Sequence, residues 1–164
     1  MINFFRSTIY VRIKPDLLSV RHIESGKEMS DIPAIAIETK GGKPTIIAVG
    51  QQAQMQLGLP NITIENGFKH PRTILATFTA AEQALRYFVK SVMPSKLFSI
   101  SPTIFIHPLI QFEGGLTQIE IRALAELGIG AGARKVYVWE GQELSDDDLY
   151  KLSFYQGKGK LLFP

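Results

Sequence analysis

The stretch Ile9-Tyr-Val-Arg-Ile-Lys-Pro-Asp-Leu-Leu-Ser-Val20 decides the fold prediction, because it describes a tight β-hairpin near the start of the chain. Residues 9–13 and 17–23 are rich in β-branched and aliphatic side chains, and Lys14-Pro-Asp16 between them is typical of a turn. Two further strands are predicted at residues 33–38 and 45–49, with a turn at residues 40–43. We expect all four strands to form one N-terminal antiparallel sheet.

Helices are predicted downstream by good helix formers and capping patterns. Residues 51–57 favour a short helix that ends at Gly58. Thr79 and Glu82 have the capping-box spacing for a longer helix that ends at Pro94. Its apolar side chains recur at helical spacing and predict packing on a core: Ala81, Ala84, Leu85, Phe88, Val89 and Val92.

The second half of the chain predicts a βαβ unit. A capping box from Thr117 to Glu120 opens a helix, and the apolar runs at residues 103–106 and 136–139 on either side are typical of buried parallel strands. An acidic helix start at residues 145–149 follows, and residues 153–164 form a basic and apolar tail. The sequence therefore predicts an α/β fold with a mixed sheet, N-terminal antiparallel hairpins, the βαβ unit and packed helices.

Composition narrows the class of protein. The 164 residues, 45% of them hydrophobic, suffice for one domain with a real core, so we expect residues 1–164 to form a single domain. The absence of cysteine excludes a disulfide framework, a thiolate zinc site and a cysteine nucleophile. No signal peptide or apolar run of membrane-spanning length is visible. The net charge of +3 is too mild to identify a partner.

Several stretches together resemble MreB, the bacterial actin family. They are Ala48-Val-Gly-Gln-Gln-Ala-Gln-Met-Gln-Leu-Gly58, Leu85-Arg-Tyr-Phe-Val-Lys90, Thr117-Gln-Ile-Glu-Ile-Arg-Ala123 and Gly130-Ala-Gly-Ala-Arg-Lys-Val-Tyr137. The order of predicted elements is similar to that of the first half of the actin/Hsp70 ATPase fold. The resemblance implies an RNase H-like half of the actin fold in a cytoplasmic protein, with peripheral contact at the inner face of the membrane as one option.

The chain departs from the family where the resemblance implies nucleotide chemistry. Arg12 stands where the family has a magnesium-organising aspartate, and Lys14-Pro15 replaces the glycine-threonine of the phosphate turn. Gly141 and Gln142 replace the glutamate and proline that follow Glu140 in the family pattern. The second phosphate loop of the family would lie beyond residue 164. The first phosphate loop alone would not enclose ATP. We therefore expect no cofactor, no bound metal and no catalysis, which describes a pseudo-ATPase.

Two residue groups remain candidate contact sites. Arg12 and Lys14 could retain an anion site, although they could equally be plain hairpin charges. Residues 1–8 could form an amphipathic lead-in whose Met1, Phe4 and Phe5 touch a membrane, although a lead-in strand or frayed end whose aromatic side chains pack on the domain is the better fit.

Other motifs carry weaker predictions. His22, His70 and His107 lack the spacing of metal ligands, and Asp146-Asp-Asp148 suits a helix start without a cation. The loop at Glu113-Gly-Gly115 is either a contact surface or an insertion that the fold tolerates.

The favoured hypothesis is a degenerate MreB-like protein that acts through protein contacts. The partner would be a bacterial actin, a morphogenetic complex or a second copy of the chain, with weak membrane association as an addition. One alternative is half of a composite ATPase that a partner chain or a dimer completes. The last alternative is a basic RNase H-like module that binds nucleic acid. It is the least favoured, because the Lys and Arg residues are scattered and a carboxylate cluster is lacking.

Overall fold

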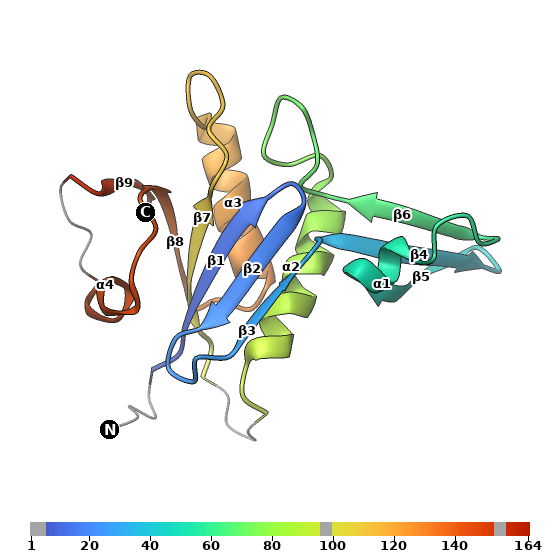
Figure 1. Ribbon diagram of the computed structural model, residues 1–164, viewed down its shortest axis with the longest axis horizontal. Coiled ribbons are helices and arrows are strands. Elements are labelled where there is room, and N and C mark those ends of the chain that lie inside the picture. Colours follow the sequence, from blue (N-terminus) through green and yellow to red (C-terminus); the bar gives the residue numbers. More distant parts are fainter. Residues whose placement is uncertain (1–5, 96–99, 153–156) are drawn as a thin grey trace.

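The computed structural model describes residues 6–95, 100–152 and 157–164, and these form two β-sheets with α2 (Phe78–Val92) between them (Figure 1). The large sheet has the strand order β3-β2-β1-β7-β8-β9. Its strands are β1 (Thr8–Lys14), β2 (Leu17–His22), β3 (Glu28–Asp31), β7 (Thr103–Pro108), β8 (Lys135–Gly141) and β9 (Gly159–Phe163). The small sheet has the order β5-β4-β6, with β4 (Ala34–Lys40), β5 (Lys43–Val49) and β6 (Ile62–Asn66).

The large sheet confirms two main predictions. β1 and β2 form the expected antiparallel hairpin, and β7 and β8 are parallel neighbours joined through α3 (Gln118–Gly130). β1 also pairs in parallel with β7, so the hairpin and the βαβ unit share one sheet. The prediction of a mixed α/β fold is therefore correct.

The prediction of one N-terminal antiparallel sheet is wrong. The short strand β3, which the sequence reasoning missed, pairs with β2. β4 instead pairs with β5 and β6 in the small sheet. β4 buries both of its faces, since Ile35 packs on α2 and Ala34 and Ala36 pack on Ala53 of α1 (Gln51–Gln54). A strand enclosed in this way forms the centre of its own sheet.

Of the two capping boxes predicted at helix starts, one is present and one is absent. The box at Thr117 is present, because its hydroxyl accepts the Glu120 N–H and the Glu120 carboxylate accepts the Thr117 N–H. The predicted box at Thr79 is wrong: α2 starts at Phe78 with Thr77 as N-cap and has no side-chain cap. The reason lies in Gly67, whose carbonyl accepts the N–H groups of Ala76 and Thr77 and fixes the chain just before the helix. α1 is also shorter than the predicted helix at residues 51–57.

The two faces of the large sheet are covered differently. On the first face, alternate strand residues such as Ile9, Val11 and Ile104 pack with α2 and α3. On the second face, an aromatic cluster is covered by residues 142–152, which include α4 (Asp146–Lys151). The cluster consists of Tyr10, Phe105, Tyr137 and Trp139, with Leu144 and Leu149 packed on it.

Within the predicted tail, residues 159–163 form β9 and extend the sheet edge beside β8. Among the described residues, no helix has the length and apolar character needed to cross a bilayer.

Candidate functional site

Arg12, on the second face of the large sheet, is held by carboxylates. Its guanidinium lies 2.6 Å from Glu28 Oε1 on β3 and 3.7 Å from Glu143 Oε1 in residues 142–152. The ring of Tyr10, two residues earlier on the same strand face, lies 5.7 Å from the guanidinium carbon. Arg12 therefore serves as the centre of an internal ion-pair cluster.

Side chains from outside the hairpin contact the turn between β1 and β2. The Asn66 side-chain amide donates to the Pro15 carbonyl at 2.8 Å, and the Lys69 ammonium lies 3.3 Å from Asp16. Lys14, the last residue of β1, is exposed. The structure thus places Arg12 and Lys14 on one strand, but it surrounds Arg12 with negative charge, and their role as an anion site stays a prediction.

A hydrogen-bond relay lies next to Arg12. Tyr10 Oη is 2.7 Å from His107 Nδ1, and His107 Nε2 is 3.0 Å from the Gly141 carbonyl oxygen. Since a carbonyl only accepts, Nε2 carries the imidazole proton, and Nδ1 accepts from the Tyr10 hydroxyl. The Tyr10 oxygen in turn accepts the Leu144 N–H at 3.1 Å. When His107 is neutral, the relay therefore selects one tautomer of its ring.

Burial sets the acid–base properties of both relay side chains. It raises the pKa of Tyr10 to about 12, although the hydrogen bond from Leu144 opposes it. Burial also lowers the pKa of His107, with Arg12 acting in the same direction and the Gly141 bond and Glu143 opposing. His107 is 1% exposed, so this pair has no access to a substrate from solvent.

The departure at Gly141 has a local structural reason. Its φ is +146°, and a Cβ there would lie 2.4 Å from the Gly159 Cα and 2.5 Å from the Lys158 carbonyl oxygen. Only glycine lets β8 and β9 approach this closely. The neighbouring Gln142 carbonyl accepts the Trp139 indole N–H at 2.9 Å.

The three histidines lie on separate elements. His22 is buried on β2, with Nε2 3.1 Å from Ser7 Oγ and 3.4 Å from Glu24 Oε2, and Nδ1 2.7 Å from Ser25 Oγ. His70 accepts the Arg72 N–H in the loop before α2, and His107 is on β7. Within the described ranges, no group of three or more His, Asp or Glu side chains could hold a metal ion.

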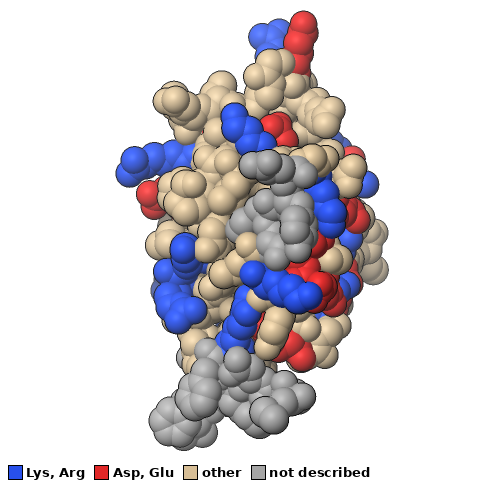
Figure 2. Space-filling model, turned by 90° about the vertical axis from the view of Figure 1, so that its left-hand side faces the viewer, with Lys and Arg blue, Asp and Glu red and all other residues tan. Residues whose placement is uncertain are grey.

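The acidic start of α4 is used internally. Asp148 forms the capping box with Ser145, and Lys158 lies 3.2 Å from its Oδ2. Asp146 pairs with Arg21 of β2, and Asp147 pairs with Lys151 at 2.9 Å. Figure 2 shows both signs of charge on this side of the molecule. Met1, Phe4 and Phe5 lie outside the described residues, so their predicted membrane contact stays a prediction.

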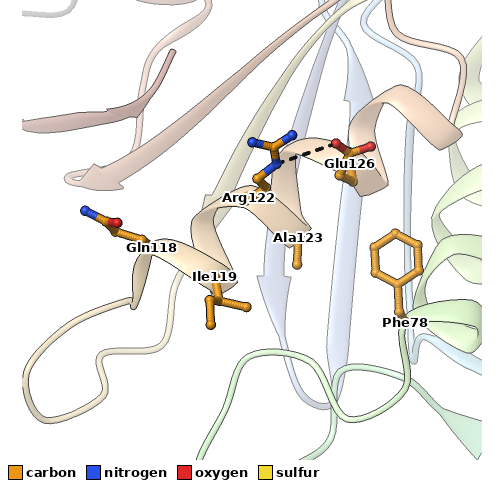
Figure 3. Close-up of a pocket in the computed structure, with 6 residues that line it drawn as sticks. All are labelled: Phe78, Gln118, Ile119, Arg122, Ala123 and Glu126. Carbon is orange, nitrogen blue, oxygen red and sulfur yellow. Dashed lines mark ion pairs between the residues drawn. The ribbon is translucent and has the colours of Figure 1, made fainter.

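A shallow surface groove lies between the start of α2 and α3. Figure 3 shows Phe78 of α2 across the groove from Ile119 and Ala123, with Arg122 and Glu126 on the same stretch of α3. Arg122 Nε is 3.9 Å from Glu126 Oε1. Ile119 is 83% exposed, a large apolar side chain left in water. The loop at residues 113–115 precedes α3, and Gly114 and Gly115 both have positive φ.

Sequence reasoning missed most of the residues around Arg12. Glu28, Glu143 and His107 come from three segments other than β1, and no local motif connects them to Arg12. The available signal was the strand alternation, which places Tyr10 and Arg12 on the same face of β1.

Comparison with known proteins finds a family match. The family model described as MreB/Mbl protein matches residues 20–145. The chain is 37% identical over 109 residues to the cell shape-determining protein MreB of Pasteurella multocida, and 32% identical over 111 residues to that of Escherichia coli K12. Each match covers 66% of this chain and 30% of the relative, so the chain matches about a third of these proteins.

Solved structures share the fold. MreB 5 of Spiroplasma citri bound to AMPPNP gives a TM-score of 0.62 at 18% identity, covering 81% of this chain and 38% of that one. The MamK double helical filament gives 0.56 at 15% identity, covering 81% and 40%. Both likenesses support part of an actin fold as the architecture of this chain.

Proposed function

This chain belongs to the MreB/Mbl family, and on that premise we propose that it contributes to cell shape as a non-catalytic member that works through protein contacts. The family resemblance in sequence and the actin-like fold are both established. The loss of nucleotide chemistry and the choice of partner are the proposal.

The observation that carries the proposal is the environment of Arg12. A magnesium ion and its phosphates need carboxylate oxygens and free N–H donors at this hairpin. The hairpin instead presents a guanidinium that is paired with Glu28 and Glu143. Pro15 adds no N–H donor, and its carbonyl already accepts from Asn66. These residues do not suit a magnesium–nucleotide complex.

The exposed groove of Figure 3 supports a role in protein contacts. Its lining includes the exposed apolar side chains Phe78 (39% exposed) and Ile119 (83% exposed), together with the Arg122–Glu126 pair. An apolar centre with a charged rim is typical of protein interfaces. We infer that the partner is a filament-forming relative or a second copy of this chain.

Binding calorimetry and thermal unfolding with ATP or ADP, with and without magnesium, test the non-catalytic part. A ligand that binds the native state must raise its stability, so we expect no change in Tm with any nucleotide. The variant Arg12→Asp, which restores the family's carboxylate, serves as the matched comparison. A magnesium-dependent rise in Tm of the natural chain would contradict the proposal, and a rise seen only when MreB is added would favour the composite ATPase.

Co-sedimentation with assembled Escherichia coli MreB tests the contact part. We expect the natural chain to sediment with the filaments, or to self-associate in their absence. Ile119→Asp should weaken this binding at least tenfold because it places a charge in the apolar centre of the groove. Arg122→Ala, at the rim, should change it little. Equal binding by the natural chain and the Ile119 variant would exclude the groove as the contact surface.

A further inference from the structure

Residues 142–152, here called the strap, cover the second face of the large sheet. Leu144 and Leu149 insert into the aromatic cluster beside Trp139. The Leu144 N–H is held by Tyr10, and the Leu149 carbonyl accepts from Arg6 at 3.2 Å. The strap connects to the sheet through Gly141, whose carbonyl is bound by His107. One relay thus holds both the start of the strap and its first apolar anchor.

Two of the charged anchors of the strap are weak individually, whereas the buried Asp148 also pairs with Lys158. Glu143 pairs with Arg12 and Asp146 pairs with Arg21, and all four side chains are at least a quarter exposed. Such partly solvated pairs contribute little each. The buried relay through Tyr10 and His107 is therefore the main polar contact between the start of the strap and the strands beneath it.

The relay works with only one protonation state of His107. When the imidazole is neutral, every polar hydrogen has an acceptor: Leu144 N–H to Tyr10, Tyr10 O–H to Nδ1, and Nε2–H to Gly141. A proton on Nδ1 turns that nitrogen into a donor, so the Tyr10 hydroxyl hydrogen loses this acceptor. A buried polar group without a partner and a new buried charge are both costly.

We propose that the strap is a pH-sensitive closure: it covers the aromatic cluster while His107 is neutral, and it comes away when His107 takes up a proton. Opening would hydrate the charged imidazole. It would also let the Tyr10 hydroxyl and the Leu144 N–H form hydrogen bonds with water. It would also expose Leu144, Leu149 and the rings beneath them, which makes an apolar surface available to a partner.

The charged groups that face His107 set the direction. Arg12 on β1 disfavours a second positive charge, whereas Glu143 on the strap favours it, and Tyr10 stays neutral because its pKa is raised to about 12. Burial dominates and keeps the pKa of His107 in the closed state below its ordinary value of about 6.5. Closure is therefore complete above about pH 6.5 and is lost as the pH falls below that value.

Trp139 is the natural probe, because it is the sole tryptophan of the chain, is 1% exposed and donates to Gln142 in the strap. We expect its emission to shift to longer wavelength as the pH falls below about 6.5, while far-UV circular dichroism keeps its native signal. His107→Gln cannot take up the proton and should abolish the shift. The matched control is His22→Gln, which removes the other buried histidine whose pKa is lowered by burial and should leave the shift in place.

Three results would overturn the proposal: constant emission in the natural chain, a shift that persists in His107→Gln, or a shift that coincides with loss of circular dichroism. If His107→Gln fails to fold, an NMR titration of the natural chain decides. The Trp139 indole N–H and the Leu144 amide must then change with the same midpoint as the His107 ring, and separate midpoints would refute the closure.

Discussion

The first face of the large sheet is covered by two helices and held by apolar side chains, whereas the second face is covered by the strap and held by a mixture of rings, ion pairs and a buried relay. Apolar burial has no proton to gain or lose, so the part of the first face beneath α2 and α3 should resist changes in pH. His22, buried at the end of β2 opposite Ile9, is the titratable exception on this face. The relay requires neutral His107, so the second face should not resist changes in pH. We therefore expect the first face to contribute most of the stability and the second face to contain the contact that responds to pH.

The largest effect should follow a change on the first face. Phe88 of α2 is fully buried among strand and helix side chains, and Phe88→Ala should cost about 3–5 kcal/mol of unfolding free energy because it leaves a cavity. Urea denaturation followed by circular dichroism measures this. The loss should be the same at pH 7.5 and at about pH 5.5, because no titratable group is removed.

Tyr87→Ala is the matched control for that substitution, since Tyr87 is the adjacent aromatic residue of the same helix and is 49% exposed. It should cost about 1 kcal/mol or less. Equal losses for the two variants would mean that the first face is not the main source of stability.

Local sequence signals predicted those parts of the fold that local chemistry determines. The β1–β2 hairpin follows from Lys14-Pro-Asp16, and the start of α3 follows from the Thr117–Glu120 capping box. The division into two sheets could not be predicted, because it depends on β3 pairing with β2 and on burial of both faces of β4. Likewise the start of α2 depends on Gly67, ten residues before Thr77.

The site divides in the same way. Arg12 was identified from its own strand, but its partners Glu28 and Glu143 become neighbours only after the large sheet and the strap have formed. Tyr10 and His107 have adjacent places on paired strands, Tyr10 beside Phe105 and Arg12 beside His107 in register. That register is a property of the sheet, and no spacing within either strand encodes it.

A smaller effect should follow removal of one hydroxyl on the second face. Tyr10→Phe keeps the ring in the aromatic cluster but leaves the Leu144 N–H and His107 Nδ1 without their partner. We expect a loss of about 1–3 kcal/mol, the cost of unsatisfied buried polar groups. Urea denaturation at pH 7.5 measures it, and the double variant with His107→Gln should lose less than the sum of the two single losses. Additive losses would show that the two side chains do not act as one relay.

The smallest effect should come from the surface of the first-face helices. Arg122 and Glu126 lie four residues apart on the exposed side of α3, with 3.9 Å between Nε and Oε1. Both side chains are more than half exposed, so water and salt screen their attraction. Arg122→Ala should therefore change the unfolding free energy by about 0.5 kcal/mol or less. A loss above about 1 kcal/mol in urea denaturation would mean that charge at the helix surface helps to hold the first face, and the contrast between an apolar face and a polar face would then fail.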